Sequence, residues 1–131
     1  MIHVRRLLIA AGLCLATAGA ADAATTLTTS VIDGPGLRCH VLDAGVKDVT
    51  VDVHADGVLS DSSGFGVGTS SILHTGDVFT LKPEDFSPGG LKMVQGHCTV
   101  IVTKGAAKTV RGSACQFDTT TSTCVVHAEA H

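Results

Sequence analysis

The chain of 131 residues contains no tryptophan and no tyrosine, and its only aromatic side chains are four phenylalanines. Its core must therefore be built from valine, leucine, isoleucine and small residues, which bury less apolar area each than aromatic residues do. Charged residues are also scarce, at 16% of the chain, and lysine and arginine form no cluster. The absence of a basic cluster, in a chain of mildly acidic net charge, argues against nucleic acid or an anionic membrane surface as the partner.

Residues 1–23 are predicted to be a signal peptide of bacterial type. Arg5 and Arg6 supply its positive start, an apolar run follows, and Ala21-Asp22-Ala23 is a small-x-small cleavage site. The apolar run is too short to span a membrane, and no later run is long enough. The arginine pair leaves general secretion and twin-arginine export both open. Either route predicts an exported protein, periplasmic or secreted.

Cleavage after Ala23 leaves 108 of the 131 residues, which is the length of one domain. Because Arg5, Arg6 and Asp22 are removed, seven basic and eleven acidic side chains remain, and the net charge is −4. Cys14 leaves with the signal peptide, so that four cysteines remain. An even number of cysteines in an exported domain predicts two disulfides, because that compartment is oxidising.

Short alternating segments predict a protein built of strands. Residues 48–54 alternate valine with polar residues, and no segment after the signal keeps a helical period over ten residues. A turn is expected at 55–57, and surface loops are expected at 60–71 and 84–90. Seven or eight short strands predict an antiparallel β-sandwich, immunoglobulin-like in shape but without that family's core tryptophan. The strands are expected at 31–32, 37–42, 48–54, 58–59, 77–81, 96–103, 108–117 and 124–129, with a strand fragment at 91–94 leading into 96–103.

Several of these segments carry short motifs in a characteristic order. They are Cys39, Val49-Thr50-Val51, Asp56-Gly57, Thr80-Leu81-Lys82-Pro83, Cys98-Thr99-Val100, Val110-Arg111-Gly112-Ser113-Ala114-Cys115 and Cys124-Val125-Val126. In this order the motifs resemble a group of small exported bacterial β-sandwich proteins of unassigned function. The resemblance covers most of residues 24–131. It implies the fold, and it supplies no catalytic residue.

The four cysteines allow three pairings. Cys39 and Cys98 each share a strand face with valines, so both are expected in the core and bonded to each other. Cys115 and Cys124 flank one short turn and are expected to form the second bridge. Their strand phases differ, and a β-bulge near residues 116–123 would reconcile them. A bridge from Cys39 to Cys115 or to Cys124 stays possible.

The histidines beside the core cysteines suggest a metal site. If Cys39 and Cys98 lie opposite each other within one sheet, His40 and His97 form a cross-strand pair on the outer face. His54 would add a third ligand from a neighbouring strand, and the three imidazoles would suit zinc or copper. If the bridge joins two stacked sheets instead, the pair does not form. A solvated tail is expected at 127–131.

Enzyme signatures are missing from the sequence. The Asp61-Ser62-Ser63-Gly64 segment departs from the aspartic protease motif, and the glycines at 64–68 lack a flanking helix. The expected function is therefore that of an exported, non-catalytic binding or structural module without a cofactor, whose partner is a protein or another envelope component. Its loops at 60–71 and 84–90 are the expected contact surface. A metal-binding envelope protein and a small secreted hydrolase are the alternatives.

Overall fold

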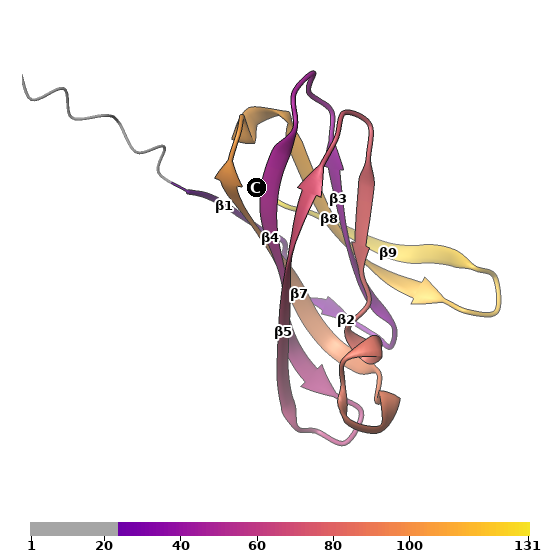
Figure 1. Ribbon diagram of the computed structural model, residues 1–131. Helices are drawn as coiled ribbons and strands as arrows, with labels where there is room; N and C mark the ends of the chain where they lie inside the picture. The colour runs from indigo at the N-terminus through magenta and orange to yellow at the C-terminus, as the bar shows by residue number, and fades with distance from the viewer. Residues whose placement is uncertain (1–23) are drawn as a thin grey trace, which may run out of the picture.

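The computed structural model describes residues 24–131, and the predicted signal peptide lies outside the described residues. The described chain forms two antiparallel β-sheets packed face to face (Figure 1). This confirms the predicted sandwich, with nine strands instead of seven or eight. Its other regular elements are three short 3₁₀ turns, η1 (Pro83–Asp85), η2 (Pro88–Gly90) and η3 (Ala107–Thr109). No helix within residues 24–131 is long and apolar enough to cross a membrane.

The first sheet, sheet A, has five strands. Its order is β1 (Thr25–Thr28), β7 (Met93–Lys104), β4 (Val49–Leu59) and β5 (Gly64–Leu73), and β2 (Ile32–Asp33) pairs with β7 further along the edge that β1 occupies. The second sheet, sheet B, has the order β6 (Val78–Leu81), β3 (Leu37–Asp43), β8 (Val110–Asp118) and β9 (Thr123–Glu129).

The core between the sheets is aliphatic. On β4 the side chains of Val49, Val51 and Val53 are buried while the residues between them are partly exposed, as the alternation predicts. The core cluster contains valine, leucine, isoleucine, alanine, methionine and cysteine, and Phe65 and Phe79 pack only at its margin. Small apolar residues thus fill the sandwich, and the contribution of covalent links to stability grows accordingly.

Both predicted disulfides are present. Cys39 on β3 is bonded to Cys98 on β7, so this bridge joins sheet B to sheet A through the core. Cys115 and Cys124 join the neighbouring strands β8 and β9. The register of these two strands shifts between Gln116 and Phe117, which face Val126 and Cys124. The extra residue, Val125, makes the bulge that the strand phases required.

Two predictions of local structure are wrong. The strand β4 continues through the expected turn at 55–57, and the chain turns only at 60–63. The expected loop at 60–71 is mostly strand β5, which pairs with β4 along its whole length. Glycines at alternate positions of β5 hide its period, yet they leave room for neighbours: a side chain at Gly68 would collide with the ring of His54, which crosses over that position.

The end of the chain is also ordered. Residues 127–129 belong to β9 and are not a solvated tail. His131 and Thr28 exchange backbone hydrogen bonds of 3.2 and 3.3 Å, so the last residue joins the edge of sheet A at β1. Figure 1 shows the C-terminus near β1. The two sheets are thereby connected along this edge by backbone hydrogen bonds.

Candidate functional site

The outer face of sheet B carries an unusual group of polar side chains. Cys39 and Val41 of β3 point into the core, so Arg38 and His40, which alternate with them, point outward. Arg38 lies opposite Cys115 of β8 in the strand register. The second disulfide is therefore on the same outer face as Arg38 and His40.

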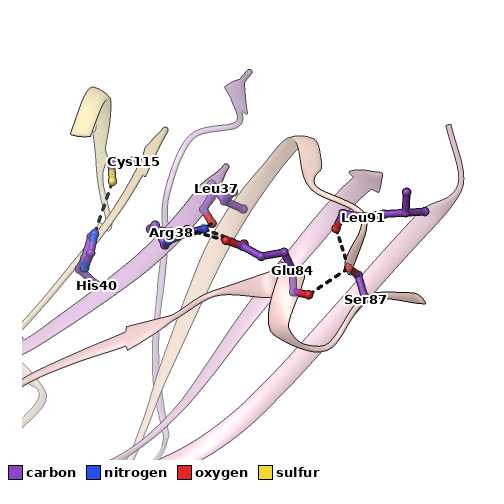
Figure 2. Close-up of polar contacts among 7 residues, drawn as sticks. All are labelled: Leu37, Arg38, His40, Glu84, Ser87, Leu91 and Cys115. Atoms are coloured by element: carbon purple, nitrogen blue, oxygen red, sulfur yellow. Dashed lines mark hydrogen bonds and ion pairs between the residues drawn. The ribbon is translucent and has the colours of Figure 1, made fainter. Parts of the chain in front are cut away.

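His40 lies against this disulfide. Its Nε2 atom is 3.4 Å from Sγ of Cys115 and 3.7 Å from Sγ of Cys124. Its Nδ1 atom shares a hydrogen bond of 3.0 Å with the hydroxyl of Thr80. Burial lowers the pKa of His40 below its ordinary value, and the positive charges of Arg38 and His127 lower it further. Figure 2 shows the ring of His40 directed at the sulfur of Cys115.

Arg38 is a buried cation, with 7% of its surface exposed. Its guanidinium group donates to both carboxylate oxygens of Glu84, at 2.5 and 2.6 Å, and to the carbonyl oxygen of Leu37 at 3.1 Å (Figure 2). The ring of Phe117 covers the guanidinium group with its centroid 5.0 Å from Cζ. Two-point pairing and an aromatic cover together fix the position of this charge.

The segment that supplies Glu84 is held in place by its own turns. Pro83 is buried and begins η1, and Ser87 begins the turn that follows. The hydroxyl of Ser87 lies 2.5 Å from the carbonyl oxygen of Leu91 and 3.4 Å from that of Glu84 (Figure 2). The 84–90 segment therefore positions the counter-ion of Arg38.

These side chains surround a cleft of about 400 Å³, which is lined by Arg38, His40, Thr80, Lys82 and Phe117. Lys82 is exposed at this cleft and belongs to no ion pair within residues 24–131. The cleft thus offers the ammonium group of Lys82 and an aromatic ring, and its wall includes the hydroxyl of Thr80 and the imidazole of His40, which bond each other. Such a combination of an apolar wall and a few placed polar groups is typical of ligand sites.

A larger hollow, of about 470 Å³, lies near the chain end and is lined in part by Thr25, Lys108, Arg111 and His131. All four of these side chains are exposed. In the cleft on sheet B, by contrast, Arg38 is buried and held from two sides. We therefore place the candidate site on sheet B, because Arg38 is buried there between Glu84 and Phe117, whereas the four side chains named at the larger hollow are exposed.

The structure does not assemble the three histidines that were expected to bind a metal. Because the Cys39–Cys98 bridge joins the two sheets, His40 and His97 point away from the core on opposite faces of the sandwich. His54 and His97 lie on the outer face of sheet A, where His54 pairs with Thr99 and His97 pairs with Asp56. The predicted cross-strand histidine pair is therefore wrong.

Soft donors gather around His40 instead. In the part of the chain that the structure describes, the only three metal-binding side chains with donor atoms within 4.8 Å of one another are His40, Cys115 and Cys124. The two sulfurs are bonded to each other, so they are not free to bind a metal in this state. Sequence reasoning placed His40 on an outer face but had no signal for its neighbours, because Thr80 and Cys115 come from strands whose order in the sheet it did not determine.

Comparison of the chain with protein-family models, curated proteins and solved structures finds no match. The resemblance to small exported bacterial β-sandwich proteins therefore stays a prediction.

Proposed function

We propose that the protein is an exported, non-catalytic binding module that holds an organic anion in the cleft on sheet B. The observation that carries this proposal is the fixed, buried Arg38 beneath Phe117, at the same cleft as the exposed Lys82, which has no ion-pair partner among residues 24–131. An ammonium group and an aromatic ring at one cleft suit a carboxylate that is attached to a flat apolar group. Such a group can belong to a free small molecule or to an envelope component.

One further feature supports binding without catalysis, and another supports export. Both ring nitrogens of His40 already have partners, Thr80 and the disulfide, so neither is directed into the cleft as a general base. Two disulfides suit an oxidising compartment outside the cytoplasm. The proposal keeps part of the contact surface expected from the sequence, because the 84–90 segment supports the cleft through Glu84.

The test is an NMR titration of the oxidised protein with benzoate, which carries a carboxylate on a flat ring. We expect saturable shifts at Arg38, Thr80, Lys82 and Phe117. The Lys82→Ala variant should weaken binding by about two- to fivefold, the range for an exposed charge pair, and the matched exposed-lysine variant Lys47→Ala should leave it unchanged. Shifts that do not saturate, or equal effects of the two variants, would contradict the proposal.

A further inference from the structure

A second function is built into the same face and does not depend on the cleft's ligand. His40 Nε2 lies close to both sulfurs of the Cys115–Cys124 bridge, at 3.4 and 3.7 Å. An imidazole nitrogen and two cysteine sulfurs are a donor set that soft cations prefer. The bridge therefore masks two of the three ligands of a potential metal site.

The distances fit a tetrahedral centre. With Zn–N near 2.0–2.1 Å and Zn–S near 2.3 Å, a nitrogen and a sulfur on one tetrahedral ion lie about 3.6 Å apart. The two observed distances bracket this value. Only the sulfurs must separate, to about 3.8 Å by the same geometry. His40 is thus already in position, and its bond to Thr80 through the other ring nitrogen orients the ring as metal-binding histidines are oriented.

A neighbouring histidine lies near enough to take part in the site. His127 of β9 lies directly opposite Cys115 and is exposed, and its ring lies outside the group of three donor atoms, so it can supply the fourth ligand only by turning its side chain. Arg38 lies opposite Cys115 on the other side. Two thiolates and a neutral imidazole leave no net charge with Zn²⁺ and one negative charge with Cu⁺, and Arg38 adds no net charge because it is paired with Glu84.

The two disulfides differ in their exposure to solvent. Cys39 and Cys98 are 0% and 1% exposed between the sheets. Cys124 is partly exposed at the edge strand, although its partner Cys115 is buried. Cys124 is therefore the most accessible of these four cysteines to a reducing molecule, and the core bridge is shielded, since exchange requires access to a sulfur atom.

We propose that reduction of the Cys115–Cys124 bridge opens a site for a thiophilic d¹⁰ cation, Zn²⁺ or Cu⁺, with His40, Cys115 and Cys124 as ligands. A dithiol supplies the two electrons and two protons: one of its sulfurs attacks Cys124, the S–S bond breaks, and the dithiol leaves as a disulfide. The metal then displaces the two thiol protons and binds the two thiolates and the neutral imidazole. The site is closed when oxidised and open when reduced.

The test uses the purified protein, reduced with a phosphine under anaerobic conditions so that no added thiol competes for metal. Alkylation and mass mapping should label Cys115 and Cys124 and leave Cys39 and Cys98 unlabelled. Co²⁺ then stands in for Zn²⁺, and tetrahedral thiolate ligation should give sulfur-to-cobalt charge-transfer bands with a single ion per chain. In a parallel arm, Cu⁺ is titrated against a chromophoric chelator. Saturable binding of one ion per chain in either titration supports the site, and the titration that saturates indicates which kind of metal it binds.

Variants separate this site from nonspecific binding. His40→Ala should lower metal affinity by more than the roughly 10- to 100-fold that loss of a supporting residue causes. His40→Gln tests the same ligand with less change in packing, and His97→Ala, on the opposite face, should bind as the parent protein does. Binding by the oxidised protein, unchanged affinity in both His40 variants, labelling of all four cysteines, or no saturation by either metal would overturn the proposal. Benzoate binding by the oxidised protein is independent of each of these outcomes.

Discussion

Glu84 neutralises a cation that solvent barely reaches. Its carboxylate lies 2.5 Å from the guanidinium group of Arg38, whose side chain is 8% exposed, while 19% of the Glu84 side chain is exposed. Removing one member of such a pair leaves a buried charge without a partner, and this costs more than the intact pair contributes. The stability of this end of the sandwich therefore depends on a residue in the 84–90 segment.

We predict that Glu84→Ala lowers the free energy of unfolding by about 3 kcal/mol, the lower end of the range for broken buried pairs because Glu84 is not fully buried. Asp85→Ala, at the exposed neighbouring carboxylate, should change it by less than about 0.5 kcal/mol. Urea denaturation measures both. Combining Arg38→Met with Glu84→Ala should recover most of the lost stability. Equal losses in Glu84→Ala and Asp85→Ala would contradict the ion-pair interpretation.

His40 and His74 should titrate on opposite sides of the ordinary histidine pKa. Burial, Arg38 and His127 lower the pKa of His40, whereas a 2.9 Å bond to Asp48 raises the pKa of His74. We predict that NMR titration finds the midpoint of His40 below 6.5 and that of His74 above it. Asp48→Asn should lower the titration midpoint of His74 and leave that of His40 unchanged. The same midpoint for both histidines in the parent protein would contradict the prediction.

The two shifts have opposite effects on stability. Because the pKa of His40 is lower when folded, the unfolded chain binds more protons between the two values, and this group favours folding increasingly as pH rises towards 6.5. The pKa of His74 is higher when folded, so its contribution is complete below 6.5 and is lost as pH rises through its folded value.

Among single residues, the core cysteines could be predicted from the sequence, whereas most residues of the cleft could not. Cys39 and Cys98 were identified because each shares a face with valines on its own strand. Arg38 gave no such signal, because its burial depends on Glu84 and Phe117, which come from other parts of the chain. Strand periodicity predicts which face a residue lies on, and it does not predict contacts between distant segments of the chain.

Strands β4 and β7 approach each other closely at a pair of glycines. Gly57 lies opposite Gly96, and a Cβ atom at position 57 would overlap the carbonyl oxygen of Gln95 and lie 2.7 Å from Cα of Gly96. Both atoms belong to the backbone, so they cannot turn aside as a flexible side chain does. The central pair of sheet A thus depends on glycine at this point.

We predict that Gly57→Ala lowers the free energy of unfolding by about 1–3 kcal/mol, as overpacking does elsewhere. Gly64→Ala is the matched control, because a Cβ at position 64 meets nothing within 4 Å. That variant should be neutral or stabilising by up to about 1 kcal/mol, since alanine restricts the unfolded chain. Thermal unfolding followed by circular dichroism compares the two. Similar melting temperatures would show that β4 and β7 can separate without cost.

At the scale of elements, the strand β5 shows where sequence patterns fail. Its glycines at alternate positions remove the hydrophobic contrast by which a strand is recognised. The pairing with β4 stabilises it through backbone hydrogen bonds, which carry no side-chain signal. The bulge in β9 was predictable, because two cysteines expected to bond had opposite phases along their strands.

The two disulfides should differ in their contribution to the whole molecule. Cys39 and Cys98 are 59 residues apart and connect the two sheets, whereas Cys115 and Cys124 are nine apart within one hairpin. From loop-closure entropy, the double variant Cys39→Ala/Cys98→Ala should lose about 4 kcal/mol and Cys115→Ala/Cys124→Ala about 2.5 kcal/mol. Urea denaturation under non-reducing conditions measures both. The reverse order would contradict the entropic account.

The sandwich as a whole was predictable, because its valine alternation, cysteine number and absence of helical period all favour the same architecture. The order of the strands in the sheets was not predictable, since periodicity indicates which face a residue lies on but not which strands are adjacent. The histidine hypothesis depended on that missing information: one arrangement of Cys39 and Cys98 pairs His40 with His97, and the arrangement found separates them.

The bridge between the sheets also determines how the protein responds to a pulling force. Tension applied at residues 24 and 131 would pass from β3 through the Cys39–Cys98 bond to β7, and from β8 through the Cys115–Cys124 bond to β9. The strands β4, β5 and β6 lie between Cys39 and Cys98 in the chain, so they carry none of this load along the backbone. Stretching would extend the outer segments and leave β4, β5 and β6 within a closed covalent loop.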